Sequence, residues 1–236
     1  MKVFVRFLIL VAVFGIIGII IVGMSLNALV KTGVETMGSK VLGVPVTLKE
    51  ADISLLSGGK DMRTSLNELI IENPAGYKTD YAFSVPSVHV LVDRNSVLTN
   101  TVVIDEIMLD GPVITFESLS LGSNLGDIQD NLKRNTGSES DDGEGEKTEK
   151  HADGEEPEKN VHIKKVTMRN ARINLILFDG QKKAIPLSLP DFQLWDIGKA
   201  SGRTSFPKVS AKIFDAIYEA VMKTVTATDK PFDQFR

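Results

Sequence analysis

The chain of 236 residues contains no cysteine, one tryptophan and only three histidines. Without cysteine it has no disulfide framework, no thiol nucleophile and no zinc or iron–sulfur centre held by thiolates. His89, His151 and His162 lie far apart, and none has the spacing of a zinc site. We therefore expect structural or surface histidines, no metal and no cofactor, and a fold that its apolar core alone holds together.

Catalytic motifs are absent as well. The sequence has no P-loop, no G-x-G-x-x-G and no G-x-S-x-G elbow, and LSGGK at 56–60 stands at a turn rather than beside a P-loop. No cluster of basic residues marks a nucleic-acid interface. The sequence predicts a protein that is not an enzyme, with no catalytic residues and no nucleic-acid partner.

One long apolar run stands near the start, FLILVAVFGIIGIIIVGMS at residues 7–25. As a helix it would span about 28 Å, close to the hydrocarbon thickness of a bilayer, and we predict a transmembrane helix there. The alternative is a cleaved signal peptide, although its apolar core is usually shorter and the only weak cleavage site is near Ala28. Lys2 and Arg6 predict that residues 1–6 stay in the cytoplasm and that the bulk lies outside it.

Charge is concentrated in one segment. Residues 137–160 carry ten acidic side chains against three lysines, a net −7, so the remainder of the chain carries +3. The segment has no large apolar side chain and cannot offset its ordering entropy by burial. We predict a disordered acidic loop over 136–160. A calcium-binding tract is the alternative, but the alternating ligand pattern is missing.

Between the apolar run and the C-terminus the sequence predicts a helix followed by one β-rich domain. Apolar residues at three- and four-residue steps predict a juxtamembrane helix over 26–43. Alternating runs over 44–225 predict strands, and a shift of phase near the start of this region predicts a bulge. Within the domain, residues 123–135 predict a helix capped by Ser123 or Asn124. Residues 226–236 form a tail.

An amphipathic helix is predicted over 208–225. Its apolar stripe is formed by Val209, Ile213, Ile217 and Val221. Such a stripe usually packs across an open sheet face and closes it. The alternative is that the helix docks on a membrane or in the groove of a partner.

Several strand runs do not alternate cleanly between apolar and polar residues. This predicts that both faces of the sheet are covered, by a helix, a second sheet or lipid. The candidate apolar groove face consists of Val88, Val90, Val92, Val103, Ile107, Leu109, Ile173, Leu175 and Leu177.

Three stretches resemble the AsmA family of bacterial envelope proteins. They are the segment GVPVTLKEADISLLSGG with the following strand that ends in NPAGY, the segment SVLTNTVVIDEIMLDGPVITFE, and the later SNLGDIQDNLKR with LPDFQLWDIG. The resemblance covers residues 1 to about 200, with a gap at the acidic loop.

This resemblance implies a single-pass inner-membrane anchor and a periplasmic, curled antiparallel β-sheet that forms a groove. It implies a non-enzymatic role in lipid transport or outer-membrane biogenesis, with membrane lipid and possibly an envelope protein as partners. The alternative is a structural or scaffold envelope protein with a closed core and no lipid ligand.

Overall fold

The computed structural model describes residues 25–54, 61–119, 122–137, 159–177, 184–199 and 204–227. The predicted transmembrane helix over 7–25, apart from Ser25, lies outside the described residues, as do nearly all of the predicted acidic loop and most of the tail. In the described part of the chain, no helix is long and apolar enough to cross a membrane.

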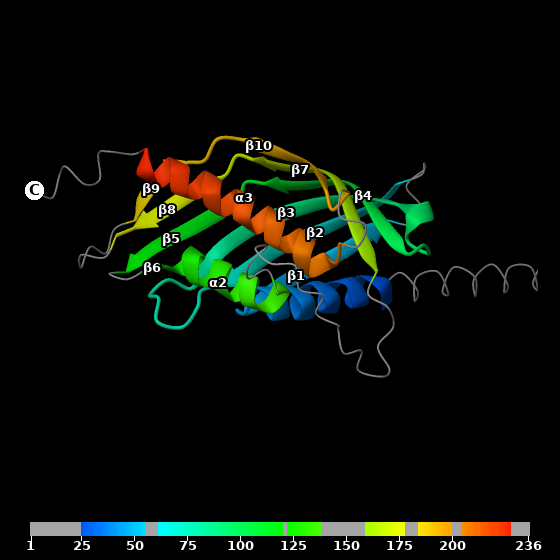
Figure 1. The fold of residues 1–236 in the computed structure, drawn as a ribbon, viewed down its shortest axis with the longest axis horizontal. Helices are drawn as coiled ribbons and strands as arrows, with labels where there is room; N and C mark the ends of the chain where they lie inside the picture. The colour runs from blue at the N-terminus through cyan, green and yellow to red at the C-terminus, as the bar shows by residue number, and fades with distance from the viewer. Residues whose placement is uncertain are drawn as a thin grey trace, which may run out of the picture.

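The described residues form an N-terminal helix over 25–42, ten strands, two further α-helices and a short 3₁₀ helix (Figure 1). In chain order after the N-terminal helix they are β1 (Val46–Ser54), β2 (Asp61–Glu72), β3 (Tyr81–Asp93), η1 (Arg94–Ser96), β4 (Thr101–Asp110), β5 (Val113–Leu119), β6 (Gly122–Ser123), α2 (Asn124–Thr136), β7 (Asn160–Arg169), β8 (Arg172–Ile176), β9 (Ile185–Ser188), β10 (Phe192–Ile197) and α3 (Phe206–Thr226).

Most strands join end to end into longer lines, which we call rails. β4 and β5 both pair with β3 and form one rail, β7 and β8 form the next, and β10 and β9 form the last. With β1, β2 and β3 the sheet therefore has six rails. β4 pairs with β7, and β5 with β8, in parallel, because α2 lies between these rails in the chain. The expected curled antiparallel sheet is thus wrong: the sheet is mixed and not curled.

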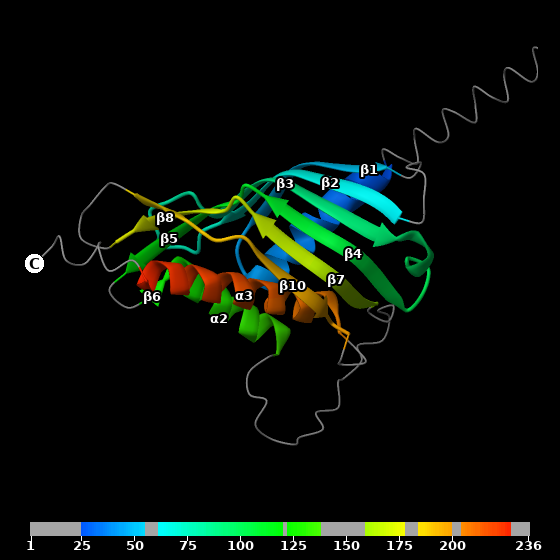
Figure 2. The ribbon, with the colours of Figure 1, turned by 90° about the horizontal axis from the view of Figure 1, so that it is seen from above.

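The N-terminal helix, α2 and α3 all cover the same face of this sheet (Figure 2). Val30 and Val34 of the N-terminal helix pack on β1, β2 and β3. Buried residues of α2 and α3 pack together over β3, β5 and β8, and Val209 at the start of α3 packs on β7 and β10. One continuous apolar layer therefore lies between the sheet and its helices.

All six rails contain an extra residue at aligned positions, and we call this line across the sheet the crease. In each rail, two core-facing residues are three positions apart instead of two: Leu48 and Ala51, Leu66 and Leu69, Val85 and Val88, Leu109 and Pro112, Met168 and Ala171, Leu189 and Phe192. Neighbouring rails keep these residues in register. Glu68, Gly111 and Asn170 lie on the crease with positive φ angles of 51°, 66° and 55°. Each rail thus holds one extra residue at the crease, and on either side of it every second side chain again faces the core.

Helix ends follow their capping residues. The Ser123 hydroxyl accepts a hydrogen bond from Gly126 N at 3.1 Å and starts α2, as predicted. Pro207 lies in the first turn of α3, which begins after Ser205. Gly43, at φ 68°, ends the N-terminal helix where the sequence predicted.

The N-terminal helix also seals the outer edge of β1. Four side chains one turn apart, Asn27, Lys31, Glu35 and Ser39, bond to the backbone of that strand. Glu35 accepts from Leu48 N at 2.9 Å, and Ser39 accepts from Val46 N at 2.8 Å. Unpaired strand groups are otherwise a template for another chain. The helix is therefore fixed to the sheet and closes this edge.

Candidate functional site

The predicted groove residues lie mostly inside the helix-covered core. Ile173 and Leu175 have no exposed surface and Val88 is 5% exposed. Val90, Ile107, Leu109 and Leu177 pack partly buried against the core clusters. Val92 is half-buried at the end of β3.

Val103 lies on the opposite face from the other candidate groove residues. It stands opposite His162, while its neighbour Ile104 packs in the core with Ile163. The register slips between Leu91 and Val92. Because of this bulge, Val103 and Ile107 do not share a face, although simple alternation along β4 would place them together.

The apolar stripe of α3 fills the space above these residues. Val209 and Val221 are 1% and 0% exposed, Ile217 is buried, and Ile213 packs half-buried against the same clusters. Phe214, which the predicted stripe did not include, packs edge-to-face on Phe83 with ring centroids 5.8 Å apart. In the described structure, the helix closes the apolar face of the sheet, as the first of the two interpretations expected.

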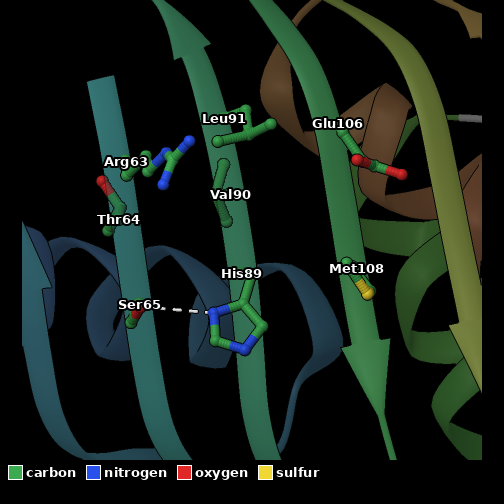
Figure 3. A pocket seen from close by; sticks show the side chains of 8 residues that line it. All are labelled: Arg63, Thr64, Ser65, His89, Val90, Leu91, Glu106 and Met108. Atoms are coloured by element: carbon green, nitrogen blue, oxygen red, sulfur yellow. Dashed lines mark hydrogen bonds between the residues drawn. The ribbon is translucent and has the colours of Figure 1, made fainter. Parts of the chain in front are cut away.

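The opposite face carries two transverse rows of mixed side chains. The first row is Arg63, Leu91, Glu106, Lys165 and Trp195; the second is Ser65, His89, Met108, Thr167 and Gln193. The part of these rows on β2, β3 and β4 lines a shallow hollow of about 330 Å³ (Figure 3). Its lining mixes the charged and polar side chains of Arg63, Ser65, His89 and Glu106 with Leu91 and Met108, so it differs from the continuous apolar groove that the sequence predicted.

His89 in this hollow contacts two serines. Its Nδ1 lies 3.3 Å from Ser65 Oγ and its Nε2 lies 3.2 Å from Ser87 Oγ. A serine hydrolase needs a carboxylate on the second nitrogen to orient the imidazole. Glu106 does not take that place: it stands one row along and points toward β7 (Figure 3). The arrangement therefore lacks the third member of a catalytic triad.

Glu106 is instead held by its neighbours on β7. Its carboxylate lies 2.9 Å from Lys165 Nζ and accepts from Thr167 Oγ1 at 3.3 Å. Lys165 in turn lies 5.4 Å from the centroid of the Trp195 ring, whose side chain is 63% exposed. These contacts hold the long side chains of the first row flat along the sheet.

Lys164 stands among carboxylates near the ends of β2 and β3. It pairs with Asp105, and Asp93 and Asp61 lie close enough to act on its charge. The hydrogen bond to Asp105 is the main reason that the pKa of Lys164 is raised above its usual value. Within the described residues no group of histidine, aspartate and glutamate side chains could hold a metal ion. The lysine offsets part of the negative charge of these three carboxylates.

The NPAGY segment forms a buried polar latch. Asn73 donates to Thr79 O at 2.7 Å, and Asn124 at the start of α2 donates to Asn73 Oδ1 at 2.7 Å. Glu117, which is 3% exposed, accepts from the backbone N–H groups of Lys78 and Thr79 at 2.9 and 3.1 Å. These bonds satisfy buried polar groups and tie the 73–80 loop to β5 and α2. The NPAGY segment therefore has a structural role in this fold, as the anchor point of the 73–80 loop.

Tyr77 adds one more bond to the latch. Its hydroxyl donates to Asp127 Oδ2 at 2.7 Å. Burial of the phenol, and then the bond to Asp127, raise the pKa of Tyr77 well above its usual value near 10. The phenol is the donor, so it stays protonated in the folded protein through the neutral range.

No protein-family model, curated protein or solved structure matches the chain. The resemblance to the AsmA family stays a prediction.

Proposed function

We propose that this protein is a non-enzymatic component of the bacterial envelope, anchored in the inner membrane by residues 7–25. Its sheet domain lies in the periplasm and acts as a structural module with a closed core, in support of outer-membrane homeostasis. Of the two functions that the AsmA resemblance left open, this is the scaffold function.

The observation that carries this proposal is the filled apolar face. The side chains that a lipid chain would have to contact, such as Ile173 and Leu175, belong to the same buried cluster as helix residues such as Ile217 and Val221. A lipid could enter only if α3 left the sheet, and this would expose a layer of buried aliphatic and aromatic side chains to water.

The way the domain is fixed to its N-terminal helix supports a structural role. Glu35 and Ser39 bond to β1, and Val30 and Val34 pack beneath it, so the sheet cannot swing freely about the helix. The opposite outer rail contains Pro186 and Pro190, and proline on an edge strand discourages further strand pairing. Both edges thus discourage pairing of the sheet with a strand of another chain.

Truncation of α3 tests the proposal. The chain without residues 204–236 should lose cooperative unfolding, because the core then lacks Phe214, Ile217 and Val221. The full-length chain, purified in mild detergent, should carry no stoichiometric phospholipid by mass spectrometry. A truncated chain that stays folded, together with full-length protein that co-purifies with phospholipid, would restore the lipid-groove function.

A photo-crosslinker at Leu177 gives a second, local readout. This residue is half-buried at the edge of the core and was a candidate for the groove. A crosslinker there should capture protein segments of the same chain. The matched control is Gln193, exposed on the opposite face. Phospholipid captured at Leu177 and absent at Gln193 would contradict the closed core.

A further inference from the structure

The end of the sheet from which the N-terminal helix begins is built of several elements. Asn27 accepts from Ile53 N at 3.0 Å, which places the start of the helix beside the end of β1. Ile53 is in register with Thr64, and Thr64 with Val90, three residues before β3 ends. The 94–100 loop therefore leaves the sheet at this same end, as Figures 1 and 2 both show. We call it the anchor end.

Two exposed leucines stand at the anchor end. Leu98 in the 94–100 loop is 93% exposed and Leu29 in the N-terminal helix is 67% exposed, and these are the two highest values for large apolar residues in the described chain. A single exposed leucine needs no explanation. Here two exposed leucines lie at the end where the N-terminal helix begins, and that helix follows an apolar run of membrane-spanning length. This arrangement indicates that one apolar partner contacts both of them.

Hydrogen bonds close the loop that carries Leu98 and tie it to the sheet. Thr99 N donates to Ser96 O at 2.9 Å, which closes a turn with Val97 and Leu98 at its two central positions. The buried Ser96 hydroxyl donates to Asp93 O at 2.6 Å and accepts from Val103 N at 2.8 Å. Leu98 is therefore held outward by the fold and loses little conformational entropy on contact with a partner.

Basic side chains flank the turn. Lys159 donates to Val97 O at 2.6 Å, and Arg94 is exposed at the base of the same loop. Asp93 at the start of the loop caps the 3₁₀ helix by accepting from Asn95 N at 3.0 Å, and Asp61 and Asp105 at the same end lie beside Lys164. An apolar tip with cations beside it matches the boundary between acyl chains and anionic headgroups.

We propose that the 96–99 turn inserts Leu98 into the near leaflet of the same bilayer that holds residues 7–24, with Arg94 and Lys159 at the headgroups. The inference rests on the anchored placement proposed above. The occupant is the membrane because the apolar run of membrane-spanning length ends at Ser25, at the end of the molecule where the turn projects. The domain then has a second point of contact and a fixed tilt.

The absence of cysteine allows a direct test. The full chain with Leu98→Cys, labelled with an environment-sensitive NBD dye, is reconstituted in vesicles of phosphatidylethanolamine and phosphatidylglycerol. A second sample carries Ser188→Cys, an exposed position on β9 in the half of the sheet beyond the crease from the anchor end. We expect a blue shift and quenching by nitroxide-labelled phospholipid at position 98, and neither at position 188. Thermal unfolding by circular dichroism verifies that both labelled chains are folded.

The possible outcomes distinguish failure of Leu98 insertion from failure of the membrane anchor proposed for residues 7–25. Carbonate extraction first reports whether the chain is integral to the vesicles. If it is integral and the dye at position 98 emits as in water, without quenching, the turn does not insert and the proposed function stands. If carbonate releases the chain, the anchored placement fails and the inference fails with it. With insertion established, a larger share of phosphatidylglycerol in the vesicles should increase the quenching at position 98, and Arg94→Gln should lessen that increase. An increase of the same size in the Arg94→Gln variant would show that Arg94 does not contact the headgroups.

Discussion

On the helix-covered face, the rails present aliphatic and aromatic side chains that are nearly all buried, among them Phe83, Ile114 and Met168. On the opposite face, the same strands present Arg63, Glu106, Lys165 and Trp195, which remain in contact with solvent. The difference shows that one face of this sheet determines whether the chain folds, while the other is free to vary or to bind. Five substitutions, ordered by expected effect, test that division.

Phe214→Ala should have the largest effect. The ring is 5% exposed and packs on Phe83, so truncation leaves a cavity in the core. We expect a loss of about 3–5 kcal/mol in the free energy of unfolding, measured by urea denaturation. Phe206→Ala is the control, because Phe206 lies on the same helix and is 40% exposed. Equal losses at the two positions would mean that α3 does not pack as described.

Glu117→Gln tests the latch. The new amide group would face the backbone N–H groups of Lys78 and Thr79, so donors would oppose donors. We expect a loss of about 1–3 kcal/mol and faster hydrogen exchange in the 73–80 loop. Glu72→Gln, an exposed change at the end of β2, should leave both unchanged. Unaltered exchange in the Glu117 variant would show that the loop is held by other contacts.

Glu35→Ala tests the sealed edge of β1. It removes the acceptor for Leu48 N and should cost about 1 kcal/mol, with faster exchange of the Leu48 amide. Thr36→Ala is a close control, because Thr36 is the next residue on the same helix and is exposed. The prediction is wrong if the two variants exchange Leu48 at the same rate.

Tyr77 predicts a dependence on pH at the alkaline end. Its pKa is higher in the folded than in the unfolded chain, so the protonated phenol adds stability that is full below about pH 10. That stability is lost as the pH rises from there toward the folded pKa. Tyr77→Phe should remove this part of the decrease in the free energy of unfolding at alkaline pH, and should change that free energy little near neutral pH. Ultraviolet titration that shows ionisation of Tyr77 near its ordinary pKa in the folded protein would contradict it.

Trp195→Ala should have the smallest effect, below about 1 kcal/mol, because the ring is 63% exposed and its main contact is with Lys165. Urea denaturation under the conditions used for Phe214→Ala makes the comparison direct. A loss similar to that of Phe214→Ala would mean that the open face is covered in solution, and the division between the two faces would be incorrect.

Local signals in the sequence located the helices well. Ser123 as a cap, Gly43 as a stop and the 3.6-residue spacing of Val209, Ile217 and Val221 act within a few turns, and the structure confirms all of them. Bulges were harder to place. The shift from Leu48 to Ala51 was visible as a change of phase, but the slip beside Asp105 was not, so Val103 was assigned to the wrong face.

The long-range features could not be predicted from one sequence. Strands that cross the crease are apolar on both faces when a fixed period of two is applied to them, and this interpretation led to a groove covered by lipid. The parallel pairing of β4 with β7 joins residues about sixty positions apart, for which no local signal exists. The latch at Glu117 was also missed, because a lone glutamate in a strand carries no mark of burial.

The crease constrains how such a chain can change. Removing one residue from a single rail at Glu68 or Asn170 would turn every later side chain of that strand to the other face. Its neighbours would remain in their old phase, so the deletion could not be accommodated one strand at a time. The extra residue would have to be gained or lost in six rails together. A shared crease would therefore be a mark of common descent that outlasts any detectable likeness of sequence.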